Sequence, residues 1–261
     1  MKRHGLLAVL LCAAAALGGC ERDGVQDITG SVPASRIRFF NFGVNSPGVN
    51  FYANETKMTA TSSATGVESV VGVNYGGVGS AGLYSGIEPG QYTFSGRISD
   101  TIPKANKDFA ISTVPATIEA GKHYSFYQSG IYNTATRTVD GFVVEDAFPA
   151  AIDYGTVYIR FVNAIHNSSP MTLYLKHTVT GEEVAIGGPV AYKSGGAFIA
   201  IPGGTYSLTT RTTGSSTSAI TRPDAISFVP SRVYTISSRG DMTVTGTTAT
   251  NRPFLDNTAN R

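Results

Sequence analysis

Short runs of β-branched and aromatic residues recur along most of the chain, separated by glycine, proline, asparagine and serine. The clearest runs cover residues 36–42, 91–98, 123–130, 156–164, 205–211 and 232–238. They either alternate apolar and polar positions or are apolar throughout, which is typical of strands with one or both faces buried. No long stretch has helical periodicity. The pattern therefore predicts an all-β fold of antiparallel, Ig-like sandwiches.

The first nineteen residues follow a different pattern, with a basic start at 2–4 and an apolar run over 5–16. This run is too short for a transmembrane helix, which needs about 20 residues. It predicts a secretory signal peptide over residues 1–19. The run ends in the sequence LGGC at 17–20, which resembles the bacterial lipobox.

The lipobox resemblance implies cleavage between Gly19 and Cys20, after which Cys20 is the first mature residue and carries the lipid. Each buried methylene of an acyl chain contributes about 0.8 kcal/mol, so several chains of the palmitate type would hold the protein on a membrane permanently. Lipoproteins retained in the inner membrane usually have aspartate after the cysteine, and this chain has Glu21. The resemblance therefore implies an envelope protein, with the outer membrane favoured where the cell has one.

Residues 20–35 form a polar segment rich in Asp, Gly, Ser and Pro without apolar periodicity. Such composition predicts a flexible tether after the lipidated residue, with an end-to-end distance of roughly 20 Å. The folded region is expected to begin at residue 36.

The folded region contains an internal repeat, because residues 37–52 align without a gap on residues 159–174. The identical pairs include Ile37 with Ile159, Arg38 with Arg160, Phe39 with Phe161, Asn41 with Asn163, Asn45 with Asn167, Ser46 with Ser168 and Tyr52 with Tyr174. Two later segments also correspond, 73–94 with 190–208 and 118–126 with 228–236. The repeat predicts one sandwich over 36–149, a second over 156–247, and a polar C-terminal tail over 248–261.

The repeated order is a first strand ending in Asn, an aliphatic-Tyr strand, a turn followed by Tyr, and a further Tyr strand. This order, over about 36–146 and 156–247, resembles the family called domain of unknown function 4397. The resemblance implies tandem β-sandwich modules of the kind found in secreted and surface-attached bacterial proteins. It implies no particular activity.

Four repeated polar residues have structural explanations. Tyr92 and Tyr206 each follow a glycine turn, where a tyrosine can bury its ring and bond its hydroxyl to backbone at the sandwich corner. Asn41 and Asn163 end a first strand and are expected to bond the backbone of the following loop.

Charge and cysteine content narrow the range of functions and of stabilising bonds that can be expected. The chain has 20 basic and 18 acidic residues, and two of the basic residues lie in the signal. A balanced mature chain lacks the positive field that concentrates nucleic acid, so nucleic-acid binding is not expected. Membrane association must then come from the lipid. The two cysteines are Cys12 and Cys20, so the folded region has no disulfide.

The sequence offers no convincing catalytic or metal site, and no cofactor is expected. The segment GVGSAG at 77–82 fits G-x-G-x-x-G, but no helical pattern follows, so it predicts a glycine-rich strand or hairpin. The three histidines after residue 20 have no metal-ligand spacing. The acidic pairs at 145–146 and 182–183 are adjacent, which places their side chains on opposite faces of a strand. They are interpreted as solvated strand ends or turns.

Two features are candidates for binding. In the run HYSFYQSGIY at 123–132, Tyr124 and Phe126 share the core face, which leaves Tyr127 and Tyr132 as candidates for an aromatic surface. The tripeptide at 239–241 is Arg-Gly-Asp, which some adhesion receptors bind, and it is predicted to form an exposed hairpin tip.

These observations together predict a lipid-anchored envelope protein without catalytic activity, acting as a binding or structural module. Its expected partners are the membrane, through the lipid, and an envelope protein or glycan that the sequence does not identify. One alternative is a surface adhesin or carbohydrate-binding protein, which requires a contiguous exposed apolar patch of several hundred Å². The other is an envelope hydrolase, which requires an acid, a base and a nucleophile in one cleft.

Overall fold

The computed structural model describes residues 33–60, 70–99 and 106–260, and Pro33–Arg261 form one compact unit. The predicted signal peptide, the cleavage site at Gly19 and Cys20, the lipid and most of the predicted tether lie outside the described residues. Within the described ranges, no helix has the length and apolar character that a membrane crossing requires.

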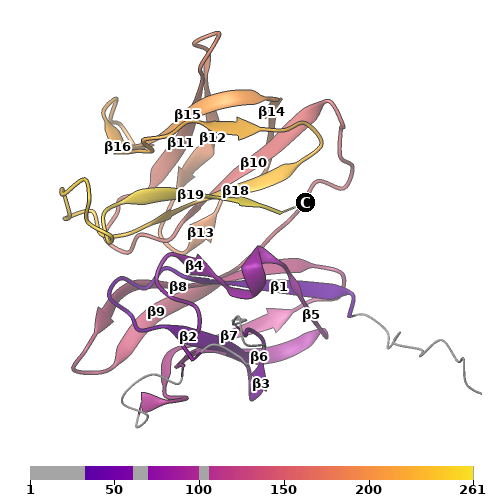
Figure 1. Ribbon diagram of the computed structural model, residues 1–261. Coiled ribbons are helices and arrows are strands. Elements are labelled where there is room, and N and C mark those ends of the chain that lie inside the picture. Colours follow the sequence, from indigo (N-terminus) through magenta and orange to yellow (C-terminus); the bar gives the residue numbers. More distant parts are fainter. Residues whose placement is uncertain (1–32, 61–69, 100–105, 261) are drawn as a thin grey trace, which may run out of the picture. The chain divides into compact units, whose positions relative to one another are not determined.

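The first sandwich consists of two sheets built from β1 to β9 (Figure 1). One sheet has the order β4 (Gly77–Val78), β1 (Ser35–Asn41), β8 (His123–Asn133) and β9 (Thr138–Glu145), and β5 (Ser85–Ile87) also pairs with β1. The other sheet has the order β3 (Thr56–Lys57), β2 (Val49–Ala53), β6 (Gly90–Ile98) and β7 (Ala110–Ile118). A short 3-10 turn, η1 (Gly79–Gly82), follows β4.

The second sandwich repeats this strand order with β10 to β19. Its first sheet has the order β13 (Ser194–Gly195), β10 (Thr156–Asn163), β18 (Val233–Arg239) and β19 (Phe254–Ala259), and β14 (Ile199–Pro202) also pairs with β10. Its second sheet has the order β12 (Glu183–Val190), β11 (Met171–His177), β15 (Gly204–Thr212) and β16 (Ser218–Thr221), and β17 (Ile226–Phe228) also pairs with β15.

The prediction of an all-β sandwich fold is confirmed. One pairing in each sandwich departs from the antiparallel pattern, because β1 is parallel to β8 and β10 is parallel to β18. The register of these pairs is equivalent in the two sandwiches, with Ile37 opposite Tyr124 and Ile159 opposite Tyr234.

Each sandwich has its own hydrophobic core between its two sheets. In the first, Phe39 of β1 stacks on Phe51 of β2 with ring centroids 5.2 Å apart. In the second, Phe161 of β10 and Ile236 of β18 are fully buried in the core. Burial of one such side chain contributes roughly 1.5 to 3 kcal/mol, so the two cores can hold the described region without disulfides.

The predicted polar tail at 248–261 is wrong, because β19 (Phe254–Ala259) lies within it and pairs antiparallel with β18. Leu255 is fully buried in the second core, whereas Asn257 and Ala259 are exposed. An edge strand that buries only part of its side chains has weak apolar alternation, and this hid β19 in the sequence. The second sandwich therefore extends to the end of the described chain.

Candidate functional site

The most unusual feature of the structure is a buried polar face between the two sandwiches. Side chains alternate along a strand, so β1 and β10 point every second residue away from their own cores. Arg38, Phe40, Arg160 and Val162 on this second face are also buried. An apolar cluster drawn from both sandwiches consists of Phe40, Phe42, Tyr127, Phe142, Val162 and Ala164. The sheets that contain β1 and β10 therefore bury both of their faces.

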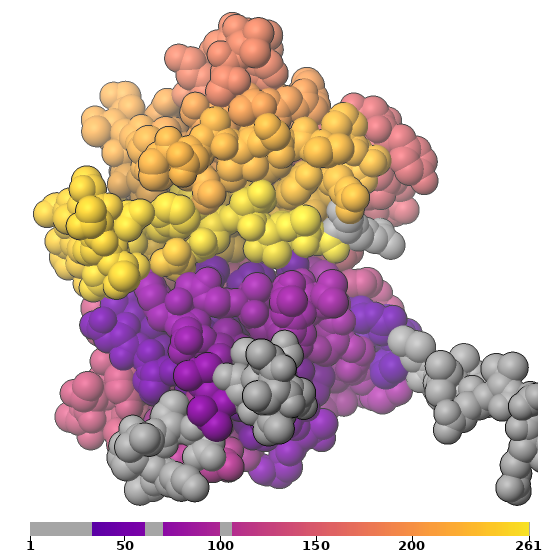
Figure 2. Space-filling view, viewed as in Figure 1, coloured from indigo at the N-terminus to yellow at the C-terminus, as the bar shows by residue number. Residues whose placement is uncertain are grey.

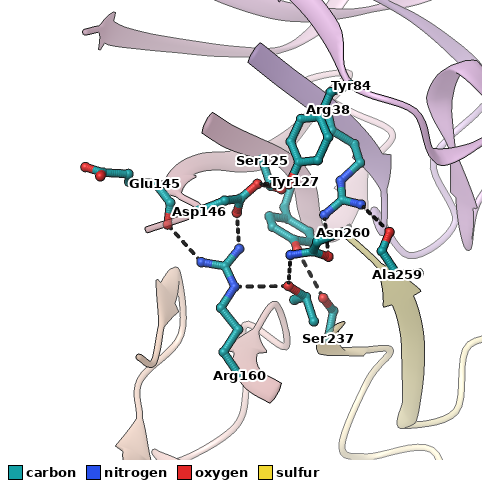
Figure 3. A network of polar contacts seen from close by, with 11 residues as sticks. Arg38, Tyr84, Ser125, Tyr127, Glu145, Asp146, Arg160, Ser237, Ala259 and Asn260 are labelled. Carbon is teal, nitrogen blue, oxygen red and sulfur yellow. Dashed lines mark hydrogen bonds and ion pairs between the residues drawn. The ribbon is translucent and has the colours of Figure 1, made fainter. Parts of the chain in front are cut away.

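Tyr127 and Ser237 lie at the centre of this face (Figure 3). The Tyr127 ring stacks on Phe40 with centroids 4.5 Å apart and on Phe142 with centroids 5.2 Å apart. Its hydroxyl lies 3.1 Å from the Ser237 hydroxyl of the second sandwich. Burial raises the pKa of the Tyr127 phenol. The neutral phenol is therefore a stable partner for this hydrogen bond.

Arg160, from β10 of the second sandwich, reaches the end of β9 in the first. Its Nη1 donates to the Glu145 carbonyl at 2.8 Å, and its Nη2 forms an ion pair with the Asp146 carboxylate. Its Nε donates to the Thr235 hydroxyl at 3.0 Å. The side chains of Arg160 and Asp146 are 2% and 0% exposed, so this is a fully desolvated ion pair.

Arg38, from β1 of the first sandwich, makes the corresponding contacts with the second sandwich, at the end of β19. Its Nη1 donates to the Ala259 carbonyl at 3.3 Å and its Nη2 donates to the Asn260 side-chain oxygen at 3.0 Å. Its guanidinium carbon lies 4.4 Å from the centroid of the Tyr84 ring and 5.2 Å from that of Phe40. Arg38 is fully buried, and its Nε has no hydrogen-bond partner among the described residues.

The contacts on the two sides are related by the internal repeat. Arg38 is equivalent to Arg160, and Asn260, whose backbone N–H bonds the first residue of β18, is equivalent to Asp146, whose backbone N–H bonds the first residue of β8. The aromatic rings under the two guanidinium groups are Tyr84 and Phe198, and they occupy equivalent positions next to β5 and β14. The interface therefore has the reciprocal form of a two-fold dimer contact, although both halves belong to one chain.

A second pair of equivalent tyrosines flanks the centre. The Tyr192 hydroxyl of the second sandwich lies 2.9 Å from the Ser129 hydroxyl and donates to Asp140 at 3.2 Å in the first. On the other side, Tyr75 of the first sandwich lies under the Arg239 guanidinium of the second, 5.2 Å from ring centroid to guanidinium carbon. Figure 2 shows the yellow C-terminal residues lying against the magenta and indigo surface of the first sandwich.

Tyr84 links the two arginine sites. Its ring lies under Arg38, and its hydroxyl donates to Asp146, which also accepts from the Ser125 hydroxyl at 2.8 Å. Burial raises the pKa of the Tyr84 phenol far above its usual range, and the negative charge of Asp146 adds to the rise. Tyr84 thus stays protonated and acts as a hydrogen-bond donor to the buried carboxylate.

The structure corrects the prediction of an aromatic surface. Tyr127 is 0% exposed, because the face of β8 opposite to the first core is covered by the second sandwich. Tyr132 is half-buried and packs against the first core. The exposed aromatic residues in the described part of the chain are Phe109 and Tyr154, and Arg137 lies over the Phe109 ring at 3.6 Å. A row of exposed rings is therefore not found there.

The interpretation of residues 145–146 as a solvated strand end is right for Glu145 and wrong for Asp146. Glu145 is exposed and pairs with Lys122 at 3.0 Å. Asp146 points to the opposite face, as adjacent strand residues should, and that face is closed by the second sandwich. The error has the same cause as the one at Tyr127.

The Arg-Gly-Asp tripeptide at 239–241 is not an exposed hairpin tip. Arg239 ends β18 and pairs with Asp256 of β19 at 2.5 Å, with its side chain 16% exposed. Gly240 is buried, has φ +113°, and a Cβ at this position would collide with the Arg252 carbonyl. Asp241 accepts hydrogen bonds from Thr243 and Asn167. The glycine is there because the backbone turn requires it.

Other sequence-based predictions hold. The Tyr92 hydroxyl donates to the Glu88 carbonyl at 3.0 Å, and the Tyr206 hydroxyl donates to the Pro202 carbonyl at 2.9 Å, as corner tyrosines should. The side-chain oxygens of Asn41 and Asn163 accept loop backbone N–H groups two residues on, at 3.2 and 3.1 Å. The segment 77–82 begins as the short strand β4, as predicted, but Gly79–Gly82 form the 3-10 turn η1 instead of a strand or hairpin.

The described residues hold no cluster of three or more His, Cys, Asp or Glu side chains that could bind a metal ion. Three buried ionisable side chains instead bond groups of the opposite sandwich, namely Arg38, Asp146 and Arg160. The sequence-based predictions missed this site, although the sequence contains a signal for it. An arginine occurs at the same place in two otherwise apolar strands, IRFFN and IRFVN, and such a residue needs a buried partner.

Comparison with known proteins gives one family match. A model for DUF4397, a domain of unknown function, matches residues 35–174, which is just over half of the chain and includes the first sandwich and the start of the second. No curated protein matches.

Three solved structures have weak likeness to the chain. The Bacillus anthracis TIE protein is 14% identical with a TM-score of 0.23, over 78% of this chain and 32% of that one. The human-specific toxin intermedilysin is 12% identical with a TM-score of 0.22, over 71% and 33%. A candidate cell adhesion protein from Bacteroides ovatus is 13% identical with a TM-score of 0.23, over 89% and 97%. The chain spans about a third of the length of the first two. At these TM-scores none of the three supports a functional argument.

Proposed function

We propose, from the premise that the chain belongs to the DUF4397 family of domains of unknown function, that it is a lipid-anchored envelope protein whose two sandwiches act together as one non-catalytic module. The observation that carries the proposal is the reciprocal arginine interface. Arg160 and Arg38 each leave one sandwich and bond the chain end of the other, with both guanidinium groups buried.

The interface supports a mechanical role because separating the two sandwiches would cost free energy. Separation would expose the apolar cluster around Tyr127 and would leave Arg160 and Asp146 each without its ion-pair partner. Breaking a buried ion pair by removing one partner typically costs 3 to 5 kcal/mol. Two modules joined in this way can hold a binding surface at a constant position, whereas two modules on a flexible linker cannot.

The same contacts favour a module without catalysis. A catalytic acid or base needs access to its substrate. Asp146 accepts from Arg160, Tyr84 and Ser125 and is fully buried, so its hydrogen-bonding capacity is used within the fold. This supports the non-catalytic proposal over the hydrolase alternative.

The attachment is tested by replacing Cys20, with Cys12 as the matched control. Cys20→Ala should move the protein from the membrane fraction to the soluble fraction and abolish labelling by radioactive palmitate. Cys12→Ala should leave both unchanged, because Cys12 belongs to the predicted signal peptide. A Cys20→Ala protein that remains membrane-bound and labelled would refute the proposed anchor.

A further inference from the structure

The start of β1 and the connection between the two sandwiches lie at the same end of the molecule. The strands β1 and β8 are parallel and begin side by side, and β9 ends next to the start of β8, with Glu145 opposite Tyr124. Arg160, near the start of β10, bonds the Glu145 carbonyl. In Figure 1 the start of β1 and the C-terminus after β19 lie on the same side. We call this the tether end, because the predicted tether precedes β1.

The connection between the sandwiches, residues 147–155, is apolar and has the sequence AFPAAIDYG. Connections between domains are usually rich in polar residues, glycine or proline. The one charged residue here is Asp153, whose carboxylate accepts a backbone N–H two residues on at 2.8 Å. Phe148 is half-buried and packs on Phe198 with ring centroids 5.5 Å apart, whereas Tyr154 is 82% exposed. The connection is thus packed at its start and presents an aromatic side chain to solvent near its end.

The second sandwich adds apolar side chains next to Tyr154. Thr156, two residues after it, pairs with Pro202 at the end of β14, and the Thr156 carbonyl accepts the Ser231 N–H at 2.8 Å. The end of β14 and the turn before β18 therefore lie beside the connection. The larger exposed apolar side chains of these three segments are Tyr154, Pro202, Val229 and Pro230. The tether end thus exposes several apolar side chains on neighbouring segments.

The charged side chains at the tether end carry both signs. Lys122 pairs with Glu119 and with Glu145, each at 3.0 Å. Further charged side chains there are Arg36, Glu88, Asp153 and Arg232. No positive field results that would attract anionic lipid, so contact with a membrane must depend on the apolar side chains.

The predicted lipid anchor determines which end of the molecule is near the membrane. Residues 20–32 precede the described chain, and a segment of this length spans at most about 45 Å when fully extended. The opposite end also exposes apolar side chains, including Phe109. It lies one strand length further away, because the nine-residue strand β7 runs about 30 Å between the two ends. The tether end therefore meets the bilayer first.

We infer that the tether end lies against the lipid bilayer, with Tyr154 and Val229 inserted at the level of the headgroups. Tyrosine is favoured at this level, because its ring enters the apolar region while its hydroxyl stays with the polar groups. The lipid on Cys20 supplies the attachment, and the apolar side chains fix which end of the module faces the membrane. The opposite end is then directed away from the bilayer, where an envelope partner can reach it. The inference rests on the proposed lipid anchor.

The test uses tryptophan fluorescence, because the chain contains no Trp. The full lipidated chain carrying Tyr154→Trp is reconstituted in vesicles of phosphatidylcholine, with or without bromine atoms on the upper part of the acyl chains. Brominated lipid should quench about half of the fluorescence of this variant. Phe109→Trp is the matched control, because Phe109 is 39% exposed at the opposite end, and its fluorescence should be unchanged.

Val229→Trp provides a second probe and should be quenched to a similar extent. Tyr154 and Val229 are both exposed, so neither substitution changes the core, and circular dichroism checks that each variant is folded. Absence of quenching in both tether-end variants, or stronger quenching of the Phe109→Trp variant, would overturn the inference.

Palmitate labelling and vesicle flotation distinguish this inference from the proposed anchor. A chain that is labelled and floats with vesicles but shows no quenching refutes the orientation and leaves the anchor intact. A chain that is not labelled and does not float refutes the anchor, and the inference fails with it.

Discussion

The two buried arginines occupy equivalent places in their sandwiches, but their partners differ in charge. Arg160 meets the carboxylate of Asp146 and has a hydrogen bond at each nitrogen. Arg38 meets the neutral amide of Asn260, has no partner at Nε among the described residues, and lies over the Tyr84 ring. Both guanidinium groups lie over an aromatic ring, so the difference between the two sides is an ion pair at Arg160 and a neutral amide partner at Arg38.

The difference shows how repeated sequences can diverge within a preserved interface. A buried guanidinium must recover the free energy of its lost hydration, and a carboxylate, backbone carbonyls or a ring face can each supply part of it. Ser125 explains why the two sides are not identical. Its hydroxyl is directed to Asp146, whereas the equivalent Thr235 accepts the Arg160 Nε–H.

The largest expected effect comes from removing each arginine in turn. Arg160→Met leaves the Asp146 carboxylate buried without a cation, which should lower the free energy of unfolding by about 3 to 5 kcal/mol. Arg38→Met leaves only neutral acceptors, so the loss should be about 1 to 3 kcal/mol. Urea unfolding followed by circular dichroism measures both. Equal losses in the two variants would contradict the distinction between the sites.

Alkaline pH should affect the two rings under the arginines differently, because Tyr84 can ionise and Phe198 cannot. The pKa of Tyr84 is raised by burial and by Asp146, so Tyr84 ionises in the unfolded chain first. Its contribution to stability is complete below about pH 10 and is lost as pH rises above it, at up to about 1.4 kcal/mol per pH unit. Tyr84→Phe, which makes this position like Phe198, should flatten the decline measured by thermal melting between pH 9 and 11. An unchanged decline would contradict this role.

The smallest expected effect tests whether the two sites can be made alike. Asn260→Asp gives Arg38 a carboxylate, and the Thr235 hydroxyl can donate to it as Ser125 donates to Asp146. The free energy of unfolding at pH 7 should rise by about 1 kcal/mol, because the hydrogen bond from Arg38 to a neutral amide becomes an ion pair with a carboxylate. The reverse change, Asp146→Asn, should destabilise the protein. Opposite signs for these two substitutions in urea unfolding are the required result.

Much of the fold could be predicted because it depends on local patterns. Alternation located the strands around Phe39 and Phe161, and the glycine turns before Tyr92 and Tyr206 located the corner hydrogen bonds. Burial of the second strand faces was less predictable. Tyr127 of β8 and Asp146, which follows β9, lie on a face of the sheet that is polar enough to face solvent. The burial of this face depends on another part of the chain.

Side-chain alternation and composition act over a few residues, and they suffice to predict that this chain is built from β strands and that its first strand recurs with its arginine, as Arg38 and Arg160. The meeting of the second faces, and the bonding of each arginine to the far sandwich, depend instead on the packing of residues more than 200 positions apart, such as Arg38 and Asn260. No local pattern records such contacts.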